Sequence, residues 1–152
     1  VRMASEDVGL ADPDALPLTV AAAQAVEQVG MPECALAIVQ AAAYLALAPK
    51  SNALYLAHGE VKRDVEKTVN EPVPLHLCNP VTDTMKGLGY GSGYRYAHDE
   101  PERVAPMPSL PEGLRDREYY RPKDVGWEGR ITKRLQALRA LIRSRAKPGT
   151  GA

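Results

Sequence analysis

The side chains with the greatest potential for chemistry lie between positions 70 and 100. They are His76, Cys78, His98 and Asp99, which are metal-capable or nucleophilic residue types. A zinc site normally uses pairs spaced as C-x-x-C or H-x-x-x-H, and neither spacing occurs here. Cys78, His76 and Asp99 could be drawn as a nucleophilic triad, but nothing places Cys78 on an elbow beside an oxyanion hole. We therefore predict no metal site and no catalytic residue, and we expect His76 and His98 to bond to backbone groups.

A glycine-rich run, G-L-G-Y-G-S-G-Y, occupies residues 87–94. A phosphate-binding loop needs G-x-x-x-x-G-K-[ST], and a dinucleotide site needs G-x-G-x-x-G, each between a strand and a helix. The run has neither spacing nor that context. We interpret it as a series of turns that need positive φ, held in place by the interleaved tyrosines, and we predict no cofactor in this chain.

The end of the chain is strongly basic, although the formal net charge of the whole chain is zero. Residues 127–147 carry seven basic side chains and one acidic side chain, Glu128. Two interpretations stay open: a solvated helix face that pairs with acidic groups, or a surface for nucleic acid or another acidic partner. The candidate contact residues for the second interpretation are Arg130, Arg134, Arg139 and Arg143.

Composition places the chain among ordinary globular proteins. Its 152 residues are 45% hydrophobic and 25% charged, which is enough for one domain with a core. Two cysteines do not form a secreted disulfide framework, and Cys34 is expected to be a small core residue. We find no signal peptide or membrane span, so we expect a cytoplasmic protein with no membrane partner. Because the chain opens abruptly inside a helical pattern, we expect it to be part of a longer protein.

The stretch from Pro32 to Pro49 organises the expected fold. Glu33 is its only charged residue, and Ala, Leu, Ile and Val fill most other positions, which favours a helix. A helix that is apolar nearly all round should be buried on most sides, by helices of its own chain or of another subunit. The residues predicted to form such a subunit interface are Leu36, Val39, Gln40, Ala43, Tyr44 and Leu47.

Other helices are predicted on both sides of this stretch. One ends at Gly9, a second runs from about Asp12 to Val29, and a third follows Ser51 from about residue 52 to 67. In the second of these, an apolar stripe begins at Leu16, Val20 and Ala23. One or two helical turns are expected at 81–86, and residues 117–121 could be a strand or an extended wrap. A last helix begins near 124–127 and carries an apolar stripe at Trp127, Ile131, Leu135, Leu138 and Ile142.

The expected organisation is one mainly α domain over residues 1–152. Residues 1–69 would form a helical core and residues 70–123 an irregular wrapping segment rich in Pro, Gly and Tyr. Residues 124–147 would form a basic amphipathic helix, and residues 148–152 a tail.

Several motifs together resemble one family. They are M-A-S-E-D-V-G-L-A-D-P at 3–13, Y-L-A-L-A-P-K-S-N-A at 44–53, V-P-L-H-L-C-N-P at 73–80, G-Y-G-S-G-Y-R-Y-A-H-D at 89–99 and E-Y-Y-R-P at 118–122. This order of motifs resembles the C-terminal part of the replication-associated recombination protein A family, also called MgsA, to which the Werner helicase-interacting ATPase is related.

The resemblance implies a helical bundle comparable to the collar of clamp loaders, which joins an AAA+ ATPase into a homotetramer. It implies a role at stalled replication forks, with DNA and a single-stranded-DNA-binding protein as partners, near the nucleoid. ATP and Mg²⁺ would be bound by an ATPase domain that this chain does not contain. The expected function is therefore oligomerisation without catalysis, and the alternative is a DNA-binding module that uses the basic helix.

Overall fold

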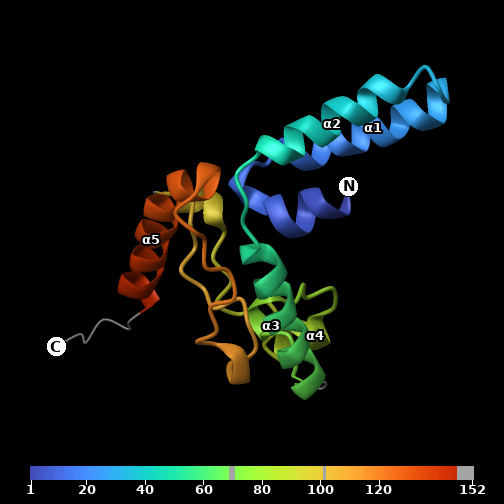
Figure 1. Cartoon of the computed structure of the whole chain (residues 1–152). Helices are drawn as coiled ribbons and strands as arrows, with labels where there is room; N and C mark the ends of the chain where they lie inside the picture. Colours follow the sequence, from blue (N-terminus) through green and yellow to red (C-terminus); the bar gives the residue numbers. More distant parts are fainter. Residues whose placement is uncertain (69–70, 101, 147–152) are drawn as a thin grey trace. The chain divides into compact units, whose positions relative to one another are not determined.

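The computed structural model describes residues 1–68, 71–100 and 102–146, and these form helices joined by irregular segments (Figure 1). No β-strand occurs in the described part of the chain, so the prediction of a mainly α fold is confirmed. The chain divides into two compact units. The first contains Val1–Arg63 and Glu118–Arg134, and the second contains Asp64–Arg117 and the chain from Leu135 onward. The tail predicted at 148–152 lies outside the described residues.

The first unit begins with a π-helical turn, η1 (Ala4–Val8), and a 3₁₀ turn, η2 (Gly9–Ala11). Two antiparallel helices follow and lie side by side, α1 (Ala15–Val29) and α2 (Ala35–Leu47) (Figure 1). Helix α1 ends where predicted, because Gly30 adopts a φ of +79° and its amide closes the last turn on the Val26 carbonyl. Helix α2 begins at Ala35, three residues later than Pro32, because residues 31–34 form the turn of this hairpin.

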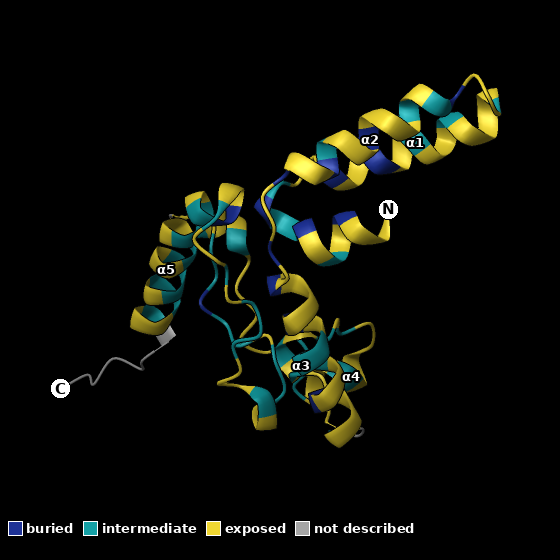
Figure 2. Cartoon of the chain, viewed as in Figure 1, coloured by how far each residue is buried: buried dark blue, intermediate teal, exposed yellow. Residues whose placement is uncertain are grey.

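A single chain does not bury α2 on most sides, so the burial expected for this helix, by its own chain or by another subunit, is not supplied by its own chain. Only Ala41 and Leu45 of this helix are buried, and most of its other side chains are exposed (Figure 2). The stripe predicted on α1 also faces outward, since Leu16, Val20 and Ala23 are exposed. The buried positions of α1 are instead Ala15 and Thr19. Composition and helix-ending residues identified both helices, but they did not identify the faces that the helices bury.

A small core joins the start of the chain to the base of the hairpin. The buried residues Ala4, Val8, Ala15, Leu45 and Ala48 form this core. Around it, the Tyr44 hydroxyl donates a 2.7 Å hydrogen bond to Asp12 Oδ2, and the Ser51 amide donates a 2.7 Å hydrogen bond to the Asp7 carbonyl. The η1 turn and the base of the hairpin are therefore held together by apolar contact and by hydrogen bonds.

A buried carboxylate links the remaining segments of the first unit. Glu128 lies in the first turn of α5 (Gly126–Ala146) and is fully buried. Its Oε2 accepts hydrogen bonds from Ser51 Oγ at 2.6 Å and from the Lys123 amide at 2.9 Å, and its Oε1 accepts one from the Tyr120 hydroxyl at 3.0 Å. Burial and this bond to Glu128 raise the pKa of Tyr120, which keeps the hydroxyl protonated as a donor. Three donors offset part of the large cost of burying a charged group.

Helix α3 (Ala53–Lys67) begins one residue after the predicted start at about 52 and ends at the predicted residue 67. Ser51 Oγ accepts a 3.2 Å hydrogen bond from the Ala53 amide while it donates to Glu128. Residues 117–123 have no regular secondary structure, so the strand that was one alternative for 117–121 does not form. Within the first unit Arg121 joins this segment to α3, since its Nη1 lies 2.8 Å from Glu60 Oε1. Lys123 joins it to the residue just before α3, since its Nζ donates a 2.6 Å hydrogen bond to Asn52 Oδ1.

The second unit is mostly irregular, as expected for this Pro- and Gly-rich sequence. Its short elements are η3 (Leu75–Leu77), α4 (Asp83–Gly87), η4 (Ala97–Asp99) and η5 (Glu112–Leu114). Helix α4 begins where Thr82 Oγ1 accepts a hydrogen bond from the Met85 amide, which confirms the helical turn predicted at 81–86.

The α5 stripe residues Ile131, Leu135, Leu138 and Ile142 are half-buried, whereas Trp127 is more exposed.

Gly126 is a position where the backbone requires glycine. Its φ is +52°, and an added Cβ would overlap the Ala11 carbonyl oxygen and approach Pro49 Cγ to 2.9 Å. The sharp entry into α5 therefore depends on a residue without a side chain.

We predict that Gly126→Ala destabilises the protein by about 1–3 kcal/mol or more, because it adds strain and steric overlap. The matched control is Gly59→Ala in α3, where nothing lies within 4 Å of an added Cβ. That control should gain about 0.5–1 kcal/mol from helix propensity. Urea unfolding measures both, and equal stability of Gly126→Ala and wild type would contradict the assignment.

Candidate functional site: an apolar hairpin and a basic helix

One side of α2 presents a continuous set of side chains to solvent. Leu36, Val39 and Leu47 are 79%, 60% and 88% exposed. Gln40 and Ala43 are also exposed and fall on the same side, because residues three and four apart are neighbours on a helix. We call these five residues, Leu36, Val39, Gln40, Ala43 and Leu47, the α2 stripe.

Tyr44, the sixth residue predicted for a subunit interface, is placed differently. It is half-buried and packs against the core at the base of the hairpin. Its hydroxyl donates to Asp12, and this hydrogen bond is the main reason that the pKa of Tyr44 is raised. Tyr44 therefore lies at the edge of the α2 stripe, with its polar end used inside its own chain.

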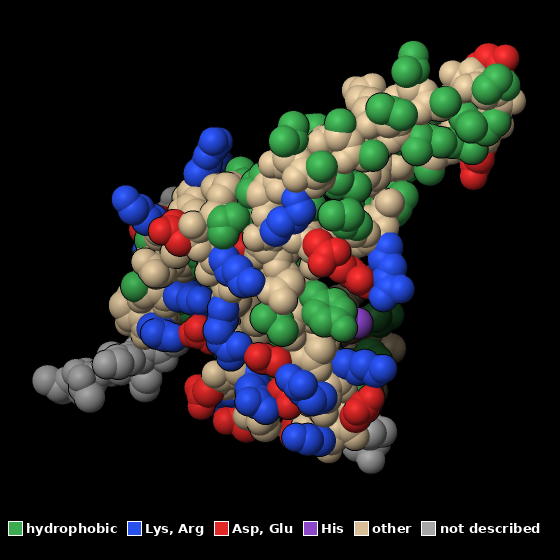
Figure 3. All heavy atoms as spheres, viewed as in Figure 1, with side chains coloured by type: hydrophobic (Ala, Val, Ile, Leu, Met, Phe, Trp, Pro, Cys, Tyr) green, Lys and Arg blue, Asp and Glu red, His purple; other side chains and the backbone are tan. Residues whose placement is uncertain are grey.

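The hairpin carries very little charge. Residues 15–48 contain no Asp, Lys or Arg, and their only glutamates are Glu27 and Glu33, both near the turn. Hydrophobic side chains cover the hairpin in the space-filling view, and acidic ones gather near its turn (Figure 3). Val29 and Met31, close to the turn, are also 59% and 64% exposed. Exposed apolar patches of this kind usually mark interaction sites.

The C-terminal end of α2 is fixed by a lysine. Lys50 Nζ donates to the Leu45 carbonyl at 2.7 Å and to the Ala48 carbonyl. These carbonyls belong to the end of the helix, where they lack helical partners, and a cation there is favoured by the helix dipole. The α2 stripe is therefore presented on a helix with a satisfied end.

The four arginines predicted to contact nucleic acid do not share one environment. Arg130 and Arg134 are exposed on the part of α5 that belongs to the first unit, with Lys133 exposed between them. Arg139 and Arg143 already interact with other groups of the chain. In the second unit, Arg145 forms ion pairs with Glu100 and Glu102. Part of the basic segment thus interacts within its own chain, and the interpretation of the exposed part as a surface for nucleic acid or another acidic partner stays a prediction.

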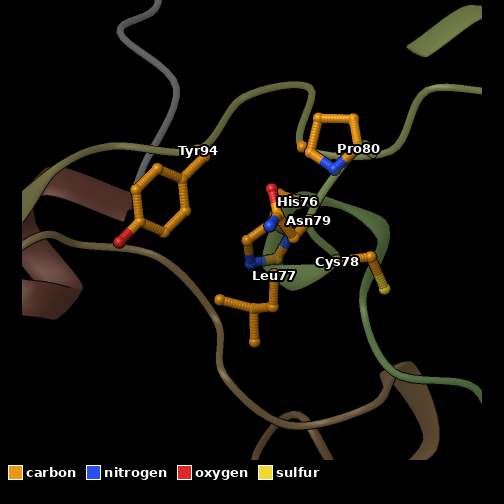
Figure 4. Close-up of a pocket in the computed structure, with 7 residues that line it drawn as sticks. His76, Leu77, Cys78, Asn79, Pro80 and Tyr94 are labelled. Atoms are coloured by element: carbon orange, nitrogen blue, oxygen red, sulfur yellow. The ribbon is translucent and has the colours of Figure 1, made fainter. Parts of the chain in front are cut away.

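The second unit contains a pocket of about 490 Å³ beside the glycine-rich run. His76, Leu77, Cys78, Asn79, Pro80, Gly91 and Tyr94 line it (Figure 4). His76 Nε2 donates a 2.8 Å hydrogen bond to the Pro108 carbonyl, as predicted. The expectation for His98 is wrong, because its Nδ1 faces Arg103 Nη1 at 3.4 Å and its ring lies 5.0 Å from that of Tyr96.

The positive φ values predicted for the glycine-rich run occur at Gly89, Gly91 and Gly93. Gly91 is the most constrained, since an added Cβ would come within 3.0 Å of Pro80.

Among the described residues, no group of three or more His, Cys, Asp and Glu side chains could hold a metal ion. None of the helices in the described residues is long and apolar enough to cross a bilayer.

Sequence reasoning missed two features of these surfaces. For α1, the sequence identified the apolar stripe that begins at Leu16, Val20 and Ala23, but not its exposure. Glu128 was counted only as the single acid of a basic segment, although it fixes the start of that helix. One signal in the sequence could have indicated the exposure of this stripe: alanine is abundant on the sides of α1 and α2 that face away from the exposed stripes.

Comparison with known proteins gives a consistent result. Residues 1–139 match the family described as "MgsA AAA+ ATPase C terminal". The chain is 49% identical over 142 residues to replication-associated recombination protein A of Coxiella burnetii, and 44% identical over 139 residues to the protein of that name in Escherichia coli K12. It is 48% identical over 125 residues to ATPase WRNIP1 of Dictyostelium discoideum.

These matches cover 93%, 91% and 81% of the chain, but only 32%, 31% and 14% of the respective relatives. The chain therefore spans at most about a third of the length of these proteins.

Proposed function

Because the chain belongs to the MgsA AAA+ ATPase C-terminal family, we propose that it is the module through which copies of such an ATPase associate. The observation that supports this proposal is the exposure of the α2 stripe, with Leu36 and Leu47 at 79% and 88%. Burying a leucine side chain contributes about 1.5–3 kcal/mol, so a second copy covering this surface would gain a substantial free energy.

A homotetramer is the assembly that we favour. A tetramer with three two-fold axes is built from isologous contacts, in which the same surface of each subunit meets itself. Such a tetramer needs at least two different contacts. The hairpin offers two exposed apolar faces, the α2 stripe and the α1 side that carries Leu16, Val20 and Ala23.

For the whole protein we propose the role that its relatives' names indicate, in replication-associated recombination, and further in repair at stalled forks. Hydrolysis of ATP with Mg²⁺ would take place outside these 152 residues, and the chain itself would contribute assembly. DNA and a single-stranded-DNA-binding protein are the proposed partners, in the cytoplasm near the nucleoid.

Light scattering on the purified chain tests the assembly. We expect the mass of four copies for the wild type, and a shift to smaller species for Leu36→Gln combined with Leu47→Gln. Each lost apolar contact should weaken association roughly 10-fold or more. Both leucines are exposed in the single chain, so the substitutions should leave folding intact.

The matched control is Leu56→Gln on α3, which changes another exposed leucine in a helix of the same unit. It should keep the wild-type mass. A wild-type chain that stays monomeric at high concentration would refute the proposal, as would a double variant that assembles like the wild type.

A second candidate function is DNA binding by α5, which the exposure of Arg130, Lys133 and Arg134 favours. Phosphate contacts release counterions, so such binding should weaken steeply as salt rises. We expect Arg130→Glu with Arg134→Glu to reduce affinity for DNA, and to lower the slope of log affinity against log salt by about 2.

The control for this test is Lys62→Glu with Lys67→Glu on α3, which makes the same change in net charge at other exposed positions. If the two double variants lose affinity equally, the effect is one of net charge and α5 is not a DNA-binding surface.

A further inference from the structure

We propose that α2 pairs antiparallel with α2 of a second copy about a two-fold axis, with Leu36 of each copy against Leu47 of the other. This inference rests on the proposed function, because it names the partner and the register of the same surface. Helix α1 packs on the side of α2 that holds Ala41 and Leu45, so the exposed side of α2, which includes the α2 stripe, is left for a partner.

The spacing of the α2 stripe, taken together with the half-buried Tyr44 at its edge, is the same from either end of the helix. Leu36, Val39, Gln40, Ala43, Tyr44 and Leu47 are separated by steps of three, one, three, one and three residues. When α2 is placed antiparallel on a copy of itself, Leu36 falls opposite Leu47, Val39 opposite Tyr44, and Gln40 opposite Ala43. An isologous contact requires this reciprocity, since each residue must meet its counterpart twice.

Charge at the two ends of the helix decides between antiparallel and parallel pairing. No charged residue occurs from position 34 to 49, and the nearest charges are the exposed Glu33 and Lys50. In the antiparallel register that sets Leu36 against Leu47, the end of α2 that follows Glu33 lies beside the end that precedes Lys50 of the other copy, at both ends of the pair. Glu33 lies in the turn before α2 and Lys50 lies just beyond its C-terminal end, so an acidic end meets a basic one. Parallel pairing would instead place glutamate near glutamate and lysine near lysine, which is unfavourable.

Two general properties of helices support the same arrangement. Antiparallel packing sets the positive end of each helix dipole beside the negative end of the other, which favours contact. Ala43 has a small side chain near the middle of the α2 stripe, and the distance between packed helices falls as contact residues become smaller. Close approach at this point would allow the leucines at both ends to reach their partners.

Disulfide formation tests the register. Leu36 and Leu47 are eleven positions apart, which corresponds to about 16 Å along a helix. A disulfide needs Cα atoms about 4.4–6.8 Å apart, so residues at the two ends of one helix cannot be joined. In the 152-residue chain with Cys34→Ala and Cys78→Ser, we compare L36C/L47C with L36C alone and L47C alone. Mild oxidation should link two copies of the double variant and neither single variant.

Light scattering on the reduced proteins accompanies the oxidation and separates the two proposals. Self-linking of either single variant would mean parallel pairing and would overturn the inference. An assembled protein that forms no link in the double variant would overturn the register but leave the proposed function standing. A chain that is monomeric with its natural cysteines would overturn both.

A second measurement avoids the engineered cysteines. Glu33→Lys in the otherwise natural chain should weaken association, because it sets two lysines together at each end of the antiparallel pair. The control is Glu27→Lys, the other acid near the turn of the hairpin, which has no counterpart of this kind in the register. Equal association of the two variants would count against the pairing.

Discussion

Small residues inside the α1–α2 hairpin are the constraint on which the surface chemistry of this protein depends. The buried positions of the two helices are Ala15 and Thr19 on α1 and Ala41 and Leu45 on α2. Alanine lets two helices approach closely, but it leaves little apolar volume between them. Most large side chains of the hairpin therefore point to solvent, where a single chain gains nothing from them. A helix this apolar is stabilised better by a partner than by water.

The base of the hairpin supplies the rigidity that such a surface requires. Glu128 accepts hydrogen bonds from Ser51, Tyr120 and the Lys123 amide, so one carboxylate fixes the turn before α3, the extended segment and the start of α5. Gly126 allows α5 to begin directly against the Ala11 carbonyl. The hairpin itself has no large apolar core. Hydrogen bonds at its base therefore supply much of the fixed geometry of the first unit.

The sequence was informative about the elements and less informative about their faces. Periodicity and punctuation located α1, α2, α3 and α5, because Gly30, Pro49 and Ser51 end or begin helices through local backbone chemistry. Local rules do not say which side of an apolar helix meets its neighbour, and so the stripe at Leu16 and Val20 did not reveal that these residues are exposed. Glu128 shows the same limit, since its donors come from positions 51, 120 and 123 and their meeting is a property of the tertiary fold.

Hydrogen exchange at two protein concentrations tests whether copies of the chain cover the exposed apolar hairpin. Association that buries α2 should slow exchange of the amides of Ala35–Leu47 at high concentration, because opening of the helix then also requires dissociation. Amides of α3 outside the hairpin should exchange at rates that change much less. Exchange of α2 that stays equally fast across a wide range of concentration would contradict the account.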